Sequence, residues 1–351
     1  MTLFPPRDAT ETVRRLTLWP GWLCCGLVAL AFGFDPAVSR RLQFVPLVIS
    51  AVFVGLPHGA IDHLVPGRLA GVSTARGALA VGAVYLVLGV GYAVVWFLAP
   101  VVGFVSFILL TLAHWGQGDV HALVALAGGV HLRSSPQRVL AGVVRGGFPM
   151  LVPLVAFPTE YERVARLLVA PFAGDATLLA PVFAPESRLA IGVAFGTLVA
   201  VHLGWGYLRR ENGGRHSDGW RRDAGETLLL GVFFLTVPPL LAVGLYFCLW
   251  HALRHVGRLT LTDEPSVEAF AAGDLWLPIR RFAVQAAPLT AVSLVFLGAF
   301  YLLVPEPPAT VAGLVGLYLV LIAALTLPHV GVVAWMDAKQ GVWSRSASER
   351  A

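Results

Sequence analysis

The sequence predicts an all-α fold, a polytopic transmembrane helical bundle of about ten membrane segments (range about 8–10). Three observations predict it. Apolar residues make up 57% of the 351 residues, charged residues only 13%, and the mean hydropathy is +0.76. An ordinary soluble domain carries about 25% charged residues, and runs of about 20 apolar residues, enough to span a bilayer, recur from end to end. We expect a single integral membrane domain over residues 1–351.

The apolar runs define the expected spans, and one run is ambiguous. In order, they cover residues 16–34, 44–65, 78–98, 101–127, 137–157, 188–208, 226–259, 282–304 and 309–336. The run at 226–259 contains Pro238-Pro239, and proline breaks a helix by removing a donor and clashing with the preceding turn. It is either one kinked helix or two segments that turn at the prolines. The first of two, 226–237, is too short to cross upright, so it would be tilted, re-entrant or extended at its start.

The distribution of basic residues decides between these two topologies. With a turn at Pro238-Pro239, 19 Lys/Arg residues lie on the side of the N-terminus and 5 on the other side, whereas one continuous span gives 12 on each. The positive-inside rule favours the uneven split. We therefore predict ten segments in the cell (inner) membrane, with both termini cytoplasmic and residues 1–15 and 338–351 as cytoplasmic tails. Arg pairs between apolar runs are typical of such loops, so we expect no nucleic acid partner.

Chemistry in a membrane protein is best sought among polar groups inside the spans, because they are costly to keep there. His251 and His255 form an H-x-x-x-H pair. On a helix the pair shares a face, with Cβ atoms about 5–6 Å apart, and can reach one cation. The alternative for this pair alone is two interfacial histidines near the basic Arg254 and Arg258.

The depth of the histidines in their spans favours a shared site. Counted from the non-cytoplasmic ends of the spans, His58 lies 14 residues deep, and His114 and His251 lie 13 residues deep. At 1.5 Å per residue, each lies about 20 Å below the surface, and His255 follows one turn later. Four neutral imidazoles at a common level suit iron, zinc or copper.

Other polar residues are weaker candidates. His202 lies at a similar level but has no flanking motif, so it is a rival ligand. His329, after Pro328, either supports a ligand histidine or contacts the substrate, or it is a helix-end histidine. Asp62 lies one helical turn beyond His58, where its carboxylate could accept the spare N–H of a ligand histidine; the alternative is a helix end that faces water. We expect solvated loop positions for the two remaining polar-loop histidines, His131 and His216.

A resemblance to a known family enters at the segment GLPHGAIDH, residues 55–63. This segment closely resembles the signature of the Brp/Blh family of membrane β-carotene 15,15′-dioxygenases, the bacterial and archaeal enzymes that make retinal for rhodopsins. The resemblance continues through His114, through YFCLWHALRH at 246–255 and through LTLPH at 325–329, so it covers nearly the whole chain.

The resemblance implies a site and an activity. The family's four iron-binding histidine positions fall on His58, His114, His251 and His255. The implied cofactor is Fe(2+), and the implied reaction splits the central double bond of β-carotene with O2 into two all-trans-retinal. The implied partners are β-carotene, O2 and the lipid bilayer, with a functional link to a retinal-binding rhodopsin. No catalytic residue beyond the metal ligands is required. Aromatic residues next to the ligands either line a substrate tunnel or pack between helices: Trp115, Tyr246, Phe247 and Trp250.

Two other classes of protein remain as alternatives. A membrane di-iron desaturase or hydroxylase needs several clustered histidine boxes, and this chain has one H-x-x-x-H pair. A non-enzymatic haem- or carotenoid-binding membrane protein that assists opsin assembly would show a Soret band or leave its carotenoid intact. Zinc is the main rival metal.

Overall fold

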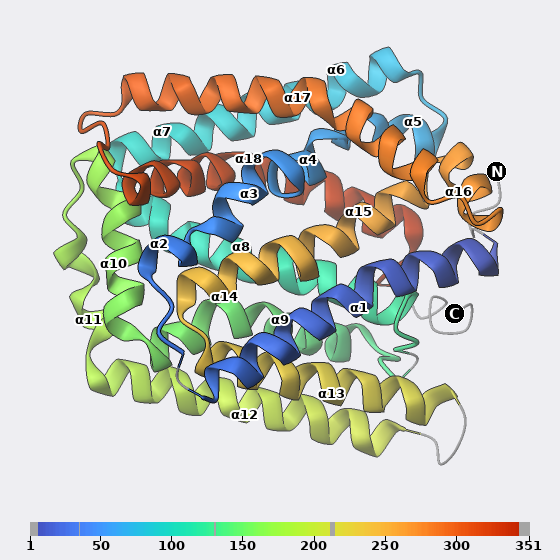
Figure 1. Ribbon diagram of the computed structural model, residues 1–351, viewed down its shortest axis with the longest axis horizontal. Helices are drawn as coiled ribbons and strands as arrows, with labels where there is room; N and C mark the ends of the chain where they lie inside the picture. Colours follow the sequence, from blue (N-terminus) through green and yellow to red (C-terminus); the bar gives the residue numbers. More distant parts are fainter. Residues whose placement is uncertain (1–5, 35, 130, 211–214, 344–351) are drawn as a thin grey trace.

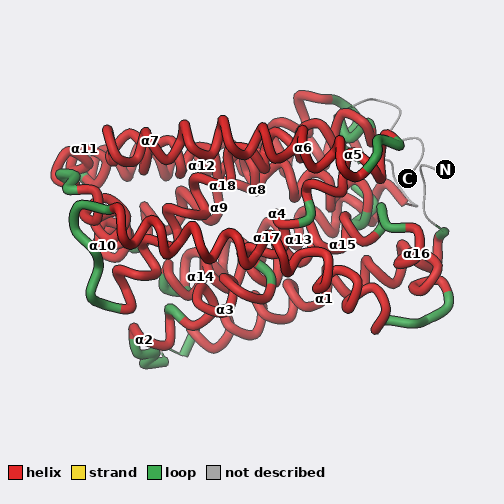
Figure 2. The backbone as a smooth tube through the Cα atoms, turned by 90° about the horizontal axis from the view of Figure 1, so that it is seen from above, coloured by secondary structure: helices red, strands yellow, loops and turns green. Residues whose placement is uncertain are grey.

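A computed structural model describes residues 6–34, 36–129, 131–210 and 215–343, with side chains from residue 218 onward in the last range. This part of the chain is helical and contains no strand. The long helices run along the long axis of the molecule, α10 and α11 lie at one end, and α16 lies at the other (Figures 1 and 2).

The helices, in chain order, are α1 (Arg7–Phe32), α2 (Arg40–Gln43), α3 (Val45–Phe53), α4 (Gly55–Ala60), η1 (Asp62–Leu64), α5 (Val65–Ala70), α6 (Thr74–Val84), η2 (Tyr85–Gly89), α7 (Val90–Leu98), α8 (Pro100–Ala125), α9 (Ser135–Ala156), α10 (Pro158–Val169), η3 (Ala170–Phe172), η4 (Ala176–Leu179), α11 (Ala180–Phe183), α12 (Pro185–Arg209), α13 (Arg215–Thr236), α14 (Pro239–Tyr246), η5 (Phe247–Ala252), α15 (Leu253–Thr260), α16 (Glu264–Ala271), α17 (Trp276–Leu303) and α18 (Val311–Gln340). The segments η2 and η5 are π-helical, and η1, η3 and η4 are 3₁₀-helical.

Within the described residues, nine helices or chains of consecutive helices are long and apolar enough to cross a membrane. They are Arg7–Phe32, Arg40–Ala70, Thr74–Leu98, Pro100–Ala125, Ser135–Ala156, Pro185–Arg209, Pro239–Thr260, Trp276–Leu303 and Val311–Gln340. The prediction of an all-α polytopic transmembrane bundle is confirmed, and the number of segments lies inside the predicted range.

The turn at Pro238-Pro239 is also confirmed. Helix α13 ends at Thr236 and α14 starts at Pro239, whose missing N–H costs nothing at the first helical position. The helix predicted to begin at residue 226 begins earlier, at Arg215. With 22 residues, α13 is about 33 Å long. Its first half is polar, which explains why α13 is absent from the nine apolar segments. It packs against α1 and α9.

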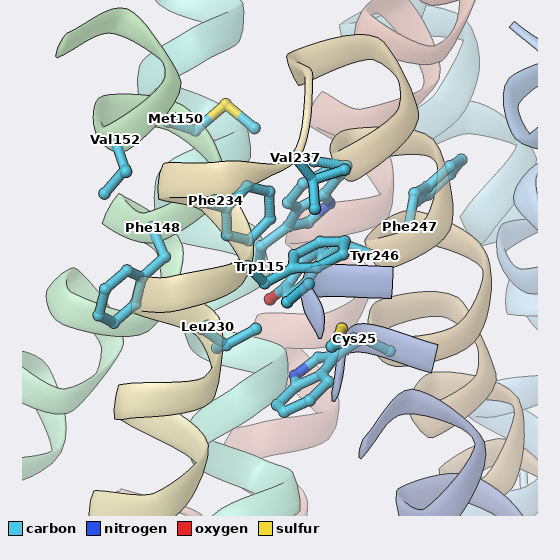
Figure 3. Packing of buried hydrophobic residues seen from close by; sticks show 14 of the residues in the cluster. Cys25, Trp115, Phe148, Met150, Val152, Leu230, Phe234, Val237, Tyr246 and Phe247 are labelled. Atoms are coloured by element: carbon cyan, nitrogen blue, oxygen red, sulfur yellow. The ribbon is translucent and has the colours of Figure 1, made fainter. Parts of the chain in front are cut away.

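The segment Pro239–Thr260, which carries His251 and His255, lies in the middle of the bundle. In the most apolar window of Pro239–Thr260, 67% of the residues are buried, against 17% for Thr74–Leu98 and Trp276–Leu303. The outer helices present their remaining apolar side chains to the exterior, as lipid contact requires. Figure 3 shows the aromatic packing at the centre, where Trp115, Tyr246 and Phe247 lie together.

Glycines set the distance between α8 and α9. A Cβ on Gly146 would lie 1.8 Å from the carbonyl oxygen of Leu112, and one on Gly116 would lie 2.0 Å from that of Gly142. Only glycine permits this approach, which is the small-residue packing of membrane helices. It fixes the position of α8, which carries His114.

The span predicted over residues 44–65 is not one helix. Val54, with φ −136° and ψ −40°, interrupts it between α3 and α4, and a 3₁₀ turn follows α4. Gly55 directly follows this interruption as the first residue of α4, and a Cβ on it would lie 2.8 Å from both Phe247 and the Tyr318 hydroxyl. Irregular backbone at membrane depth is tolerated where it is buried in protein or lines a cavity, and Gly55, Leu56 and His58 line a cavity in this protein.

Candidate metal centre

His58 lies on the short helix α4, directly after the interruption. Its Nδ1 contacts the carbonyl oxygen of Gly55, one turn earlier. A ring that donates through Nδ1 presents Nε2 as its lone-pair nitrogen. The broken helix therefore fixes both the position and the tautomer of His58.

His251 and His255 approach His58 from the π-helical segment η5 and from α15. Their ring centroids lie 5.7 and 5.6 Å from that of His58. π-Helical turns inside α-helices are frequent at functional sites, because the extra residue re-aims the side chains around it. The H-x-x-x-H pair thus faces inward rather than toward the membrane surface.

His114, on α8, completes the predicted set of four. Its Nε2 lies 3.2 Å from Nε2 of His251, and the two ring centroids are 4.8 Å apart. Two imidazole nitrogens that bind one metal ion at about 2.1 Å and at right angles stand about 3 Å apart. The pair has the spacing of two ligands of one ion.

His329, on α18, lies inside the same cluster. Its ring centroid is 5.0 Å from that of His58 and 4.9 Å from that of His114. Its Nδ1 lies 2.7 Å from Oδ2 of Asp62, and Tyr85 donates to the same carboxylate oxygen at 2.7 Å. His329 thus carries a carboxylate partner.

The expected partnership between Asp62 and His58 is wrong. It assumed one continuous α-helix, but α4 ends at Ala60, and Asp62 starts a 3₁₀ turn that aims its carboxylate at α18. His58 uses the carbonyl of Gly55 instead. Asp62 is 1% exposed, so the alternative of a solvated helix end is also wrong.

The cluster fits a metal ion. In the part of the chain that the structure describes, two groups of three candidate ligands have all their ligand atoms within 4.8 Å of one another: His58, His114 and His329, and Asp62, His255 and His329. Among the described residues, Nδ1 of His114 and Nε2 of His255 and His329 are buried without a hydrogen-bond partner. Buried polar atoms rarely stay unpaired, and imidazoles suit iron, zinc or copper.

Asp337 ties together three of the helices that carry these histidines. It lies on α18, forms an ion pair with Arg258 of α15 at 2.8 Å and accepts a hydrogen bond from Gln117 of α8 at 2.8 Å. Asp337 and Arg258 are almost completely buried, so water does not screen this ion pair. The tie sets the register of the three helices.

A cavity of about 620 Å³ opens onto the cluster. Its lining includes His58, His114 and His329 and is otherwise mostly apolar. Leu86 of η2 and Phe296 of α17 also line it, although they are 66% and 53% exposed. The cavity therefore reaches the lipid-facing surface beside α17, so an apolar molecule can enter from the bilayer.

The four aromatic candidates have different surroundings. Trp115 and Phe247 line the cavity, and their rings stack with centroids 5.8 Å apart. Tyr246 packs behind them, in the hydrophobic core, and does not line the cavity. Trp250 points away and donates to Asp119 at 2.9 Å. The structure thus leaves two of the four as candidates for substrate contact.

His202 and His131 belong to a separate charge cluster. Nε2 of His202 lies 3.1 Å and Nε2 of His131 lies 2.9 Å from Oδ2 of Asp223, which also accepts from Arg145 at 2.7 Å. His131 is completely buried, so its prediction as a solvated loop residue is wrong. The loop before α9 folds back onto α13, which sequence patterns do not reveal. The side chain of His216 lies outside the described residues.

The fold and the cluster define an integral membrane protein with a candidate metal centre that faces an apolar, lipid-accessible cavity. Residues 49–337 match the family described as Beta-carotene 15,15'-dioxygenase. The chain belongs to this family of carotenoid-cleaving dioxygenases.

Several curated proteins are similar to the chain. The probable beta-carotene 15,15'-dioxygenase Blh of Halobacterium salinarum is 46% identical over 336 residues, which cover 95% of this chain and 96% of that protein. The probable dioxygenase Brp of the same species is 33% identical over 348 residues, 96% of this chain and 94% of the relative. The beta-carotene 15,15'-dioxygenase of an uncultured marine bacterium is 25% identical over 58% of this chain and 65% of its own. No solved structure gives a significant match.

The sequence patterns predicted no role for Tyr85, and for His329 they left a helix-end position open beside a place near the ligands or the substrate. The sequence held a signal for His329, because Leu-Pro-His occurs both at 56–58 and at 327–329. The two motifs lie on helices that meet at the cluster, where their histidine rings are 5.0 Å apart. Tyr85 had no such signal, since it is one tyrosine in an apolar run.

Proposed function

We propose that this protein is an iron-dependent dioxygenase that cleaves the central 15,15′ double bond of β-carotene with O2 to give two all-trans-retinal. The observation that carries this proposal is the opening of a buried histidine cluster onto an apolar cavity that reaches the lipid-facing surface. The names of the relatives support the substrate, since two are called probable beta-carotene 15,15'-dioxygenases and the third a beta-carotene 15,15'-dioxygenase.

In this proposal His58, His114, His251 and His255 hold Fe(2+) through their ring nitrogens. Iron supplies the binding and activation of dioxygen. Two observations support a bound metal ion over rings that only pack against one another. They are the spacing of His114 and His251 and the buried ring nitrogens of the cluster that have no hydrogen-bond partner among the described residues. The choice of iron rather than zinc follows from the redox chemistry of the reaction.

The cavity orients the substrate. Trp115 and Phe247 present flat faces beside His251, against which a conjugated polyene can stack. The apolar walls exclude water, which keeps side reactions with solvent out of the site. The cleavage replaces one C=C bond by two C=O bonds and uses both atoms of O2, so no proton or external reductant enters and no other catalytic residue is needed.

The membrane is part of the proposed function. We propose that the protein lies in the cell (inner) membrane as one integral domain over residues 1–351, with cytoplasmic tails at 1–15 and 338–351. α1 starts at Arg7 and α18 ends at Gln340, so helix extends into both tail regions. β-Carotene dissolves in the bilayer and reaches the cavity beside α17. The product, retinal, is the chromophore of rhodopsins, which makes a retinal-binding rhodopsin the functional partner.

Expression in bacteria that accumulate β-carotene tests this function. We expect retinal in extracts by chromatography with the unchanged protein, and none with His58→Ala, His114→Ala, His251→Ala or His255→Ala, although each accumulates in the membrane. His121→Ala, a buried histidine of α8 outside the cavity lining, is the matched control and keeps activity. Carotenoid that stays intact with the unchanged protein would favour the haem- or carotenoid-binding alternative.

A further inference from the structure

The ring of His329 lies close to three other rings of the histidine cluster. Its centroid lies 5.0 Å from His58, 4.9 Å from His114 and 5.1 Å from His255. By contrast, His58 and His251 are 5.7 Å apart. Both groups of three candidate ligand atoms include His329.

The two ring nitrogens of His329 have different surroundings. Nδ1 lies 2.7 Å from Oδ2 of Asp62, which holds the ring proton on that side. Nε2, the nitrogen left with a lone pair, is buried and has no hydrogen-bond partner among the described residues. A ring fixed in this way directs a free lone pair into the cluster.

Asp62 is itself held in place. The Tyr85 hydroxyl donates to the same Oδ2 at 2.7 Å, and Tyr85 is the first residue of the π-helical segment η2. The chain Tyr85–Asp62–His329 joins three separate segments, η2, η1 and α18. A carboxylate that accepts the spare N–H of a histidine, and is in turn hydrogen-bonded, is the arrangement that orients metal-binding histidines and raises their basicity.

We propose that His329 is a further direct ligand of the metal ion, and that Asp62 and Tyr85 are positioning residues that act through it. This inference rests on the proposed function, because it concerns the same site. His329 then joins the four predicted histidines. Five imidazole ligands leave one position on a six-coordinate ion, where four ligands would leave two.

Metal binding, measured without turnover, tests this inference. The purified full-length protein and its variants are stripped with a chelator and titrated anaerobically with Fe(II), and bound iron is measured by elemental analysis. We expect Asp62→Asn to weaken iron binding about 10–100-fold, as loss of such a partner does. His329→Ala weakens it at least as much, and Tyr85→Phe weakens it less than Asp62→Asn.

A double-mutant cycle separates action through His329 from a structural effect. If Asp62 acts only through His329, Asp62→Asn has no further effect on iron affinity in the His329→Ala background. Tyr92→Phe is the matched control for Tyr85→Phe, because its buried hydroxyl bonds Gly103 and Ser106 away from the cavity. Tyr92→Phe and His121→Ala keep the affinity of the unchanged protein. If His329→Ala does not accumulate, His329→Gln takes its place in the cycle.

Three results would overturn the inference. Unchanged iron affinity in His329→Ala, with or without loss of cleavage, removes His329 from the ligands. Additive effects in the double variant show that Asp62 acts elsewhere. An unchanged protein that binds no iron refutes the proposed cofactor as well, so the two failures are distinguishable.

Discussion

Phe247 and Trp250 lie three residues apart on the same π-helical segment, yet their surroundings give them different roles. Phe247 lines the cavity and contacts the ring of His58, with centroids 5.7 Å apart. Trp250 is completely buried, and the guanidinium of Arg254 lies 3.9 Å over its ring. The sequence treats both as aromatic neighbours of His251. Only the π-helical geometry separates a candidate substrate contact from a residue of the core.

We expect Phe247→Ala to lower the use of β-carotene without emptying the metal site. The variant removes a face of the cavity but no candidate ligand, so the iron content stays that of the unchanged protein. The measurement is retinal formed against carotenoid concentration, together with elemental analysis. Loss of iron in Phe247→Ala would show that the ring supports the ligands rather than the substrate.

Trp250→Phe is the matched comparison, and we expect it to lower stability instead. It removes the indole N–H that donates to the buried carboxylate of Asp119, which keeps Arg254 as a hydrogen-bond donor, and a lost hydrogen bond to a charged group costs about 1.5–3 kcal/mol. The measurement is the fraction of folded protein that remains after heating, read by size-exclusion chromatography. A changed preference among carotenoids with unchanged stability would contradict this role.

At the scale of elements, close helix packing positions the site. Replacing Gly146 by alanine pushes a Cβ into the Leu112 carbonyl oxygen, 1.8 Å away, and this backbone contact cannot give way like a flexible side chain. We expect Gly146→Ala to cost about 1–3 kcal/mol or more and to displace α8, which carries His114. The measurements are heat stability and iron content.

Gly196→Ala is the control for this change. Gly196 lies on the outer helix α12, and a Cβ there meets nothing within 4 Å. We expect stability equal to that of the unchanged protein. Equal stability of Gly146→Ala would mean that α8 and α9 can separate without consequence for the fold.

The end of the bundle near α16 is held by a carboxylate outside the spans. Asp263 accepts from Arg281 of α17 at 2.7 Å and from Arg68 of α5 at 3.1 Å. Burial raises the pKa of Asp263, but the hydrogen bonds of Arg281 and Ser266 and the charge of Arg68 outweigh it and lower the pKa to about 2. Asp263 is therefore ionised in the folded protein over nearly all accessible pH.

This lowered pKa predicts an acid-sensitive contribution to stability. The folded pKa lies below the unfolded value of about 3.9, so the folded state binds fewer protons. The contribution is complete above about pH 4 and is lost as the pH falls toward about 2. Melting temperatures of the unchanged protein and of Asp263→Asn should converge over this window. Parallel curves throughout would show that Asp263 does not stabilise the fold.

At the scale of the whole molecule, hydropathy predicted the bundle because lipid requires long apolar helices whose backbone groups are satisfied internally. Depth along the spans also placed His58, His114, His251 and His255 at one level, and the structure brings them together. Their role as ligands stays a prediction. The error at Asp62 arose because residue spacing carries no information about a helix that stops at Ala60.

The burial of His131 and the contact of Tyr85 with Asp62 depend on tertiary folding. His131 precedes α9 in a segment with loop composition, yet its partner, Asp223, lies on α13, 92 residues further along the chain. Tyr85 and Asp62 lie on two different membrane segments, Thr74–Leu98 and Arg40–Ala70. Patterns in a single sequence describe each helix separately. They do not predict the contacts between helices that assemble a site.

The orientation of the bundle in the membrane can be tested by labelling single cysteines. The 19:5 division of Lys/Arg residues predicts both termini in the cytoplasm. The start of α1 and the end of α18 lie at the same end of the bundle (Figure 1). That end also holds the exposed Asp274, and the exposed Pro305 follows α17 at the opposite end.

In a background without Cys24, Cys25 and Cys248, Pro305→Cys should react with an impermeant thiol reagent in intact cells, and Asp274→Cys only after permeabilisation. Because α17 separates the two positions, the reverse pattern would invert the whole bundle and place the tails outside.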